Sequence, residues 1–521
     1  MFQLTLSLIF SAISAVLLTL SSLKILQILQ LSAYRPKGIF VWLKRSRYDY
    51  LKRFLCLAFF SFITAFLLIM SFPEFYFRYA GFAFFIVFSC FFIMLQFKEK
   101  QKTRLVFTNR ILRIISVLAI LYFLISFSLI YFLFDVSRIE FTIVSITPLL
   151  IPFVTILAFL IMFPIDMLIG KIHFNRARNK LKMAEDLIKI GISGSYGKTT
   201  TKNILAVLLS EKYKVLSSPK SFNTPMGLAK IINENNLHDF DVFLAEMGAK
   251  RVGETQQLCE FIKPKFGVVT KLGSQHLETF LTLDNAADTE FSLAKYIKEL
   301  VVLNINDELV RQRIDSIDKT KAVFLGEHAN YSNIEISEDG LKFDLNICGE
   351  SVKISTKLLG RHVAEIFSQA ALLAYKMGVG LEDIKRLAEK IEPVKHRLEL
   401  IKTSNGVVLD DAYNSNPEGA LNALEVLSCF DGIKVVVTPG FIELGDIENK
   451  ENFKLGQHAA KIADYLIVIK NFQISKGAID AGLEENKVIN VDSLDKAMEE
   501  LKKLALDKQA VLFINDLPDN Y

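Results

Sequence analysis

The sequence predicts a multi-span α-helical membrane region followed by two α/β domains. Three observations lead to this prediction. The first 170 residues contain five long apolar stretches, each close to the ~20 residues that a helix needs to cross hydrocarbon. A glycine-rich loop that ends in Lys-Thr follows a short apolar run at residues 187–192. Beyond this loop, short apolar runs alternate with helical patterns, which is typical of parallel sheets covered by helices.

The predicted membrane region is residues 1–170. Its apolar stretches are residues 2–23, 54–72, 80–97, 114–134 and 141–165. The first stretch lacks a basic leading segment and a small-residue cleavage site, so we expect a retained anchor and not a signal peptide. A composition of 51% hydrophobic residues over 521 positions also favours a protein with a membrane part.

The charges between the stretches predict the orientation. Segment 24–53 carries eight Lys or Arg residues and segment 98–113 carries six, whereas segments 73–79 and 135–140 carry one each. Basic loops face the cytoplasm, so the N-terminus is expected outside. An odd number of spans then places everything after Ile165 in the cytoplasm, where ATP is available. The expected location is the cell membrane, multi-pass, with the α/β domains in the cytoplasm.

Residues 171–185 form a basic connector, with Lys171, Arg176, Arg178, Lys180 and Lys182. We expect it to lie against anionic headgroups of membrane lipid, although a solvated helix face explains the same pattern. The net charge of +5 argues against a dedicated nucleic-acid binder. The five scattered cysteines indicate neither a disulfide framework nor a zinc site.

The phosphate-binding signal is Gly-Ile-Ser-Gly-Ser-Tyr-Gly-Lys-Thr-Thr-Thr at residues 191–201. Gly194 and Gly197 let backbone N–H groups turn toward an anion at a helix N-terminus. Lys198 is placed to reach the β- and γ-phosphates, and the Thr199 hydroxyl to bind Mg²⁺. Ile192 replaces one glycine of the full pattern, which leaves the shorter G-x-x-G-K-T form. We predict an ATP site; the alternative is a plain glycine turn between a core strand and a core helix.

The first α/β domain is predicted over residues 186–392, with a mainly parallel sheet. Its expected strands are 187–192, 241–245, 266–270, 300–304 and 322–325, and its expected helices 202–209, 226–235, 284–299 and 364–377. Polar residues follow several of these strands, namely Asn223 with Thr224, Glu246, and His276 with Glu278. Because ligands bind beyond the carboxyl ends of parallel strands, a carboxylate and an imidazole there could hold a second Mg²⁺. Each residue alone is a weak signal, since a strand-end Glu is often merely solvated.

The second α/β domain is predicted over residues 393–521 and is Rossmann-like. Its expected strands are 407–410, 435–438, 465–469, 488–491 and 510–514, separated by helices 417–428, 449–463, 474–483 and 493–505. Pro393 and the charged segment Lys395-His396-Arg397 mark its beginning.

Eight motifs in their order along the chain resemble the Mur ligase family. They are SGSYGKTTTKNIL, FNTPMGLAKII, LAEMG, GSQHLETF, LLGRH, KHRLE, LDDAYNSNP and TPGFIELG, within residues 185–521. The match looks closest to the MurF branch, which adds D-alanyl-D-alanine to a muramyl tripeptide. The resemblance implies a P-loop central domain and ATP-dependent amide formation through an acyl phosphate, with ATP and Mg²⁺ as cofactors. It implies a muramyl-peptide-like acceptor and an amine or dipeptide as substrates, and it leaves the oligomeric state open.

The resemblance also implies roles for single residues. The implied ATP-binding residues are Gly194, Ser195, Tyr196, Gly197, Lys198, Thr199, Thr200, Arg397, Asp411 and Asn414. Lys198, Glu246 and His276 carry the implied catalytic roles, and Asn223 and Thr224 the implied substrate contacts. Thr199, Glu246 and His276 are the implied metal ligands, to which Glu290 is added at the position of a carbamylated lysine. For Asn416, and equally for Asn414, a turn and helix cap explain the sequence as well.

The chain departs from the family pattern at four places. Glu290 and Ser292 replace the Lys and Glu of a Lys-x-Glu pattern, and both asparagines of Gly-x-His-Asn-x-x-Asn are missing from residues 360–366. Lys271 stands where an asparagine is common. The membrane region precedes the P-loop where soluble members carry a small UDP-binding domain. Two alternatives to a MurF-type ligase therefore remain: a tethered ligase for a lipid-linked or other carboxylate, and a nucleotide-binding membrane scaffold with weakened catalysis.

Overall fold

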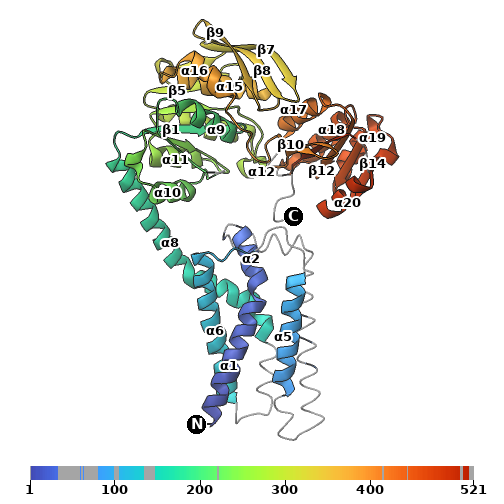
Figure 1. Ribbon diagram of the computed structural model, residues 1–521. Coiled ribbons are helices and arrows are strands. Elements are labelled where there is room, and N and C mark those ends of the chain that lie inside the picture. Colours follow the sequence, from blue (N-terminus) through green and yellow to red (C-terminus); the bar gives the residue numbers. More distant parts are fainter. Residues whose placement is uncertain are drawn as a thin grey trace. The chain divides into compact units, whose positions relative to one another are not determined.

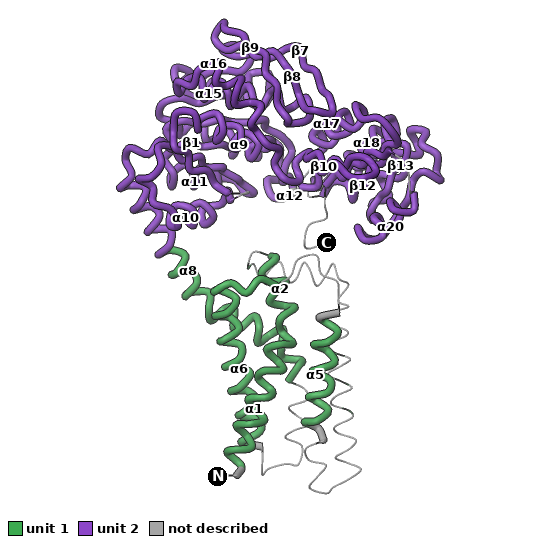
Figure 2. The backbone as a smooth tube through the Cα atoms, in the orientation of Figure 1, with its two compact units in different colours: residues 1–171, 517–521 green, residues 172–516 purple. Residues whose placement is uncertain are grey.

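The computed structural model describes residues 2–32, 34, 55, 59, 63, 80–98, 105–133, 147–219, 222–413, 416–442, 444–504 and 508–515. The chain divides into two compact units (Figure 2). Unit 1 contains the N-terminal helices as far as Lys171, and unit 2 runs from Ile172 to Asp516. Figure 1 labels their helices and strands.

The regular elements among the described residues of unit 1 are all helices. Its elements are α1 (Phe2–Ser21), α2 (Leu23–Leu31), α5 (Ala80–Lys98), α6 (Asn109–Leu133), a short 3₁₀ turn (Thr147–Leu150) and the first part of α8 (Ile151–Met183). These helices share one apolar core that includes Leu18, Phe85, Leu118 and Phe159. Across this core, the Ser22 hydroxyl and the Tyr122 hydroxyl lie 2.9 Å apart.

Three helices of the described chain have the length and composition to cross a membrane. They are Gln3–Leu31, Asn109–Phe132 and Thr147–Met183, and Phe82–Gln96 is a shorter apolar helix. Four of the five predicted stretches therefore coincide with apolar helices. The fifth, 54–72, lies almost entirely outside the described residues, as does most of the basic segment 24–53. These helices are candidates for membrane spans.

A buried carboxylate joins two of these helices. Asp166 of α8 is only 5% exposed, and Arg110 of α6 donates to it at 2.8 Å. Arg113 pairs with the other carboxylate oxygen at 2.5 Å. The predicted apolar stretch ends at residue 165, one residue before this acid, so the sequence indicates neither its burial nor its pairing.

The connector is not a separate segment, because α8 continues unbroken to Met183. Ala177 and Leu181 are buried in the core of unit 2. The Lys180 ammonium donates to three backbone carbonyls at the end of α10 (Pro225–Glu234), at 2.8 to 3.3 Å. One face of the connector therefore packs on protein.

The first sheet of unit 2 has nine strands in the order β2-β3-β1-β4-β5-β6-β7-β8-β9. The strands from β2 to β6 are parallel: β1 (Ile188–Ser193), β2 (Val215–Ser217), β3 (Val242–Glu246), β4 (Phe266–Val269), β5 (Leu300–Asn304) and β6 (Ala322–Leu325). The expected strands of this domain are confirmed within one or two residues, while β2 was not predicted.

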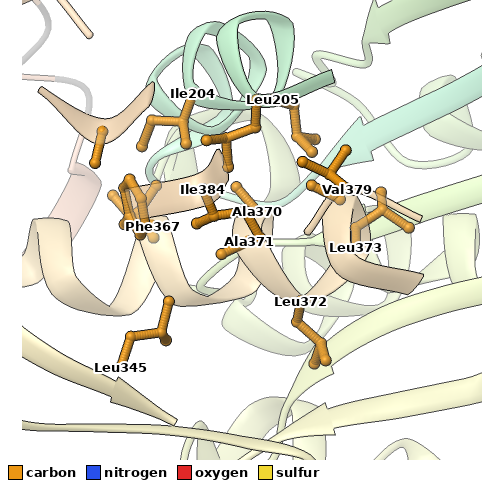
Figure 3. Close-up of a cluster of buried hydrophobic side chains, with 14 of the residues drawn as sticks. Ile204, Leu205, Leu345, Phe367, Ala370, Ala371, Leu372, Leu373, Val379 and Ile384 are labelled. Carbon is orange, nitrogen blue, oxygen red and sulfur yellow. The ribbon is translucent and has the colours of Figure 1, made fainter. Parts of the chain in front are cut away.

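Helices cover both faces of this sheet because alternate strand residues point to opposite sides. Val242 and Leu244 of β3 pack with α9 (Lys198–Leu209), α15 (His362–Lys376) and α16 (Leu381–Ala388). Phe243 and Ala245 pack with α10, α11 (Glu254–Ile262), α13 (Leu283–Tyr296) and the end of α8. Figure 3 shows α15 with Ile204 and Leu205 of α9 on one side and Leu345 on the other. The short helices α12 (Leu277–Phe280) and α14 (Glu308–Arg311) complete this part.

An antiparallel extension was absent from the sequence prediction. It consists of β7 (Ala329–Ser337), β8 (Gly340–Ile347) and β9 (Glu350–Thr356). Cys348 and Gly349 form the turn before β9 with φ of 52° and 92°. Positive φ at both central residues suits the right-handed twist of a two-residue hairpin. The sheet is therefore mixed, with a parallel part that carries the P-loop.

The second sheet has six strands in the order β10-β11-β15-β12-β13-β14. They are β10 (Glu399–Thr403), β11 (Gly406–Asp411), β12 (Ile433–Thr438), β13 (Tyr465–Ile469), β14 (Val488–Val491) and β15 (Gln509–Ile514). Their helices are α17 (Pro417–Ser428), α18 (Glu448–Ala459), α19 (Phe472–Asp480) and α20 (Leu494–Leu504). The five expected strands are confirmed, and β10 adds an antiparallel edge beside β11.

Candidate active site

The glycine loop lies between the end of β1 and the start of α9. Gly194 and Gly197 have φ of 125° and 82°, values that side chains rarely tolerate. A Cβ on Gly194 would overlap Thr270, so glycine is also required by space. Helix α9 begins at Lys198, and its free N–H groups and partial positive charge lie at the loop. This geometry suits a bound phosphate.

A buried carboxylate at the end of β3 organises the residues beside the loop. Glu246 is 2% exposed and accepts hydrogen bonds from the Thr199 hydroxyl at 3.1 Å to each oxygen. The ammonium of Lys202, also 2% exposed, lies 3.1 Å from the same carboxylate. The Asn223 amide donates to it at 3.2 Å. The predicted metal ligands Thr199 and Glu246 are thus in direct contact. Asn223, a predicted substrate residue, contacts the same Glu246 carboxylate.

Glu290 lies against the phosphate loop itself. Its carboxylate accepts the Gly194 N–H at 3.0 Å and stands 3.8 Å from the Lys198 ammonium. Burial raises the pKa of Glu290, while Lys198 and the Gly194 N–H oppose that rise. Lys198 also donates to the carbonyls of Gly194 and Ser195. A carboxyl group at residue 290 therefore reaches the P-loop directly.

His276 and Thr224 occupy helix starts. His276 precedes α12 with a φ of 56°, and Thr224 caps α10 by accepting the Gly227 N–H at 3.2 Å. A cluster able to hold a metal ion needs three imidazole, thiol or carboxylate groups close together. Among the described residues, one such cluster has its ligand atoms within 4.8 Å of one another, and it consists of His396, Glu399 and Asp410. Glu246, His276 and Glu290 are not such a set, and their shared metal role stays a prediction.

A cavity of 120 Å³ adjoins the loop and is lined by both α/β domains of unit 2. Its predicted members are Tyr196, Gly197, Thr200, Arg397 and Asp411. The Arg397 guanidinium stacks over the Tyr413 ring at 4.9 Å, which holds it at the cavity. The Asp411 carboxylate accepts the Leu398 N–H at 3.2 Å. Residues 180 or more positions apart in sequence therefore meet in one pocket.

Of the two asparagines for which a turn and helix cap was the alternative, the structure describes one. Asn414 lies outside the described residues. Asn416 lines the cavity, but its side chain accepts the Gly419 N–H at 2.9 Å and caps α17. The alternative of a turn and cap thus describes Asn416.

The structure also places at the site residues for which no role was expected. Glu365 lines the cavity and accepts a hydrogen bond from Asn304 at 2.9 Å, and burial raises the pKa of Glu365. Ile366 stands at the position of a missing asparagine, where a Cβ on Gly197 would meet it at 2.9 Å. Lys271 forms an ion pair with Glu418 across the two domains.

The place of Lys202 near the phosphate loop could have been predicted from the sequence, since it lies four residues after Lys198 on a helix. Positions four apart share a face of a helix, and that face begins at the phosphate loop. The Lys271–Glu418 pair had no comparable signal, because it joins residues of different domains.

The geometry defines a P-loop α/β protein in which a second α/β domain lines the cavity beside the loop. Residues 192–374 match the Mur ligase middle domain. Residues 396–514 match the Mur ligase glutamate ligase domain. Together the two matches cover more than half of the chain, which therefore belongs to the Mur ligase family.

Curated relatives of this chain include enzymes of one name. The chain is 30% identical over 269 residues to the UDP-N-acetylmuramoyl-tripeptide--D-alanyl-D-alanine ligase of Bacillus subtilis, a match that covers 50% of this chain and 57% of that protein. For the enzyme of the same name from Borreliella burgdorferi, identity is 30%, with coverage of 58% and 65%. The chain thus matches little more than half of the length of the former and under two thirds of the latter.

Solved structures show the same fold. MurF from Acinetobacter baumannii matches with a TM-score of 0.60 and 23% identity, over 66% of this chain and 77% of that one. MurF ligase from Thermotoga maritima in complex with ADP matches with a TM-score of 0.58 and 23% identity, over 67% and 80%.

Proposed function

We propose that this chain is a membrane-anchored, ADP-forming amide ligase of the MurF type, which joins D-alanyl-D-alanine to a muramyl tripeptide. The observation that carries the proposal is the phosphate loop with Lys198 at the start of α9 and Thr199 bonded to the buried Glu246. The names of the curated relatives support the choice of substrates.

The proposed reaction has two steps. An acceptor carboxylate attacks the γ-phosphorus of ATP, and the bond to the β-phosphate oxygen breaks to release ADP. The amine then attacks the acyl phosphate carbon, loses a proton and displaces inorganic phosphate. Neither step needs a protein nucleophile, so positioning and charge stabilisation are the tasks of the site.

Several residues of this chain are suited to those tasks. The backbone N–H groups of the loop bind phosphate oxygens, and Lys198 moves from the carbonyls of Gly194 and Ser195 to neutralise the transferred group. Glu290, 3.8 Å from that ammonium, orients it. Arg397 and Asp411, which line the cavity from the second α/β domain, are proposed to hold the nucleotide.

The residues present fit Mg²⁺. A hydroxyl and a carboxylate, from Thr199 and Glu246, stand 3.1 Å apart beside the loop, and oxygen ligands are those that Mg²⁺ prefers. Bound there with ATP, Mg²⁺ would supply charge neutralisation of the phosphates. Lys202, at 3.1 Å from Glu246, keeps this carboxylate in place. His276 and Glu290 are the further proposed ligands.

We also propose the location. Three described helices have the length and apolarity of membrane spans, and the basic segments between the apolar stretches favour a cytoplasmic ligase. In this arrangement the active site has access to ATP and to soluble precursors.

The proposal is tested with the full chain purified in detergent micelles. ADP and phosphate release are measured with ATP, Mg²⁺, UDP-linked muramyl tripeptide and D-alanyl-D-alanine, and the product is identified by mass. We expect the release of ADP and phosphate to require both the muramyl tripeptide and D-alanyl-D-alanine. The product should be heavier than the muramyl tripeptide substrate by the mass of the dipeptide less one water. Nucleotide binding without release under any substrate pair would instead establish the scaffold alternative.

A second acceptor is favoured by the helical region that directly precedes the ligase domains, since α8 runs from a candidate span into the core of unit 2. An enzyme held at a bilayer meets a lipid-linked acceptor at high effective concentration. We therefore propose that a lipid-attached muramyl peptide competes with the UDP-linked one. Equal or higher kcat/KM for the UDP-linked tripeptide, measured with full chain in bilayers, would reject the lipid-linked acceptor.

A further inference from the structure

A second cavity lies at the opposite edge of the first sheet from the phosphate loop. It has a volume of 720 Å³ and is formed by the end of α8, the end of α11 and the amino ends of β1, β4 and β5. The six residues of β1 separate the two edges by about 20 Å at ~3.3 Å per residue. The cavity is therefore distinct from the candidate active site.

Positive charge dominates the lining of this cavity. Its basic members are Arg178, Lys182, Lys189, Lys263, Lys265 and Lys298, and its acidic members are Glu185 and Glu260. The lining therefore has four more positive than negative side chains. Of the two acids, Glu260 already accepts hydrogen bonds from Gln256 at 3.0 Å and from Tyr296 at 3.4 Å.

The pairing of the strands enforces this clustering. Ile190 of β1 lies opposite Phe266 of β4, and Phe266 lies opposite Leu300 of β5. The residues just before these three positions are Lys189, Lys265 and Glu299, and they enter the sheet side by side: the Lys265 N–H donates to the Lys189 carbonyl at 2.8 Å, and the Glu299 N–H donates to the Lys265 carbonyl at 2.9 Å. The Lys265 ammonium also lies 3.6 Å from the exposed Glu299 carboxylate. Lys298 stands two residues before Leu300. Three lysines thus converge at one edge because of the register.

The floor of the cavity is apolar and firmly held. Leu181, Phe261 and Ile262 line it, and each is at most 5% exposed. The Phe174 ring of α8 stacks on Phe261 at a centroid distance of 4.2 Å. The cavity thus combines a rigid apolar floor with a basic rim.

Like charges in a partly buried hollow repel one another. The pKa of Lys189 is lowered by burial and then by the nearby charges of Lys265, Lys298 and Lys263. The C-terminal ends of α8 and α11 offset part of this repulsion through their partial negative charge. An anion bound among the lysines would remove it more completely.

We propose that this cavity binds a phosphate-bearing anion, which is either the headgroup of an anionic lipid or a soluble phosphate compound. The basic rim supplies ammonium donors for phosphate oxygens, and the apolar floor accommodates hydrocarbon beside them. A site of this kind goes beyond ligase activity and does not depend on it.

The test uses the full chain in detergent micelles with two probes. Retention of phosphatidylglycerol against phosphatidylcholine is counted by native mass spectrometry, and binding of inorganic pyrophosphate by calorimetry. The triple variant replaces Lys189, Lys265 and Lys298 by Gln. A single variant, Lys298→Glu, changes a residue that lies outside the helices and strands, so it tests the cavity without disturbing either. The control variant replaces Lys353, Lys357 and Lys454, which lie outside the cavity, by Gln. It removes the same three positive charges as the triple variant.

We expect the wild type to bind at least one of the two probes. The triple and the single variant should bind that probe at least about tenfold more weakly than the wild type, and the control variant should bind it as the wild type does. Pyrophosphate binding is measured with saturating ADP, which occupies the phosphate loop. Phosphatidylglycerol binding that pyrophosphate does not displace then identifies a lipid, and pyrophosphate binding alone, weakened in the triple variant, identifies a soluble ligand. Retained nucleotide binding by the variants shows that they fold. The proposal is overturned if neither probe binds the wild type, or if the folded variants bind as the wild type does. The lysines would then serve only the two helix ends.

Discussion

The buried pair of Lys202 and Glu246 makes a quantitative prediction about the stability of the site. Both side chains are 2% exposed, and their charged atoms are 3.1 Å apart. Replacing Lys202 by Met leaves the carboxylate buried with hydrogen bonds from Thr199 and Asn223. Loss of one partner of a buried ion pair costs ~3–5 kcal/mol. Because two donors remain, we expect about 3 kcal/mol, which is roughly a hundredfold change in an opening equilibrium.

The assay is hydrogen–deuterium exchange of the full chain in micelles, without nucleotide or Mg²⁺. The free energy of opening is read from the amides of β3 and α9, which carry the two residues. The double variant Lys202→Met/Glu246→Gln should recover at least ~1 kcal/mol relative to Lys202→Met, because no uncompensated charge remains. The control, Lys230→Met, removes an exposed lysine 3.8 Å from Glu234 and should change the free energy by less than ~0.5 kcal/mol.

Two results would refute this reasoning. One is a loss of less than about 1 kcal/mol in Lys202→Met, which would mean that water reaches the carboxylate. The other is a double variant that is no more stable than the single one, which would mean that the two charges do not interact.

The remaining predictions concern activity, pH and topology. Lys198→Ala should lower kcat by about 10²–10³, as for other groups that stabilise transition-state charge, whereas Lys230→Ala should not; near-normal turnover in Lys198→Ala would remove the P-loop from the mechanism. Activity should persist when bicarbonate is removed, since Glu290 already supplies a carboxyl group; collapse on bicarbonate removal would reject this substitution, and unchanged activity in Glu290→Ala would mean that the residue has no role. Burial lowers the pKa of His362 from 6.5 to about 4, so the folded state should lose stability as the pH falls from 6.5 toward 4. A His362→Gln variant should show a smaller loss of thermal stability over that range, and an identical pH profile would contradict a neutral imidazole at this half-buried position. A reporter fused after Met183 should be cytoplasmic and an N-terminal tag external; the reverse labelling would overturn the topology drawn from loop charges.

The sequence alone determined the parallel strands, the phosphate loop and the order of the two α/β domains. These features rest on local patterns: apolar runs of strand length, helical periodicity, and glycines where Gly194 and Gly197 take positive φ. The eight family motifs placed Thr199, Glu246 and Arg397 at one site, and the structure brings Thr199 to Glu246 and Arg397 to the adjoining cavity.

The contacts between side chains that are distant in sequence follow from the packing of the elements and not from any local pattern. Glu290 reaches the Gly194 N–H across 96 positions of sequence, and Asp166 is buried by two arginines more than 50 positions away. The cluster of lysines at the amino edge of the sheet depends on the register of β1, β4 and β5, and so do the contacts at the opposite edge. Periodicity shows which face of an element is buried but not which element covers it, because a strand or helix carries no local record of its partner.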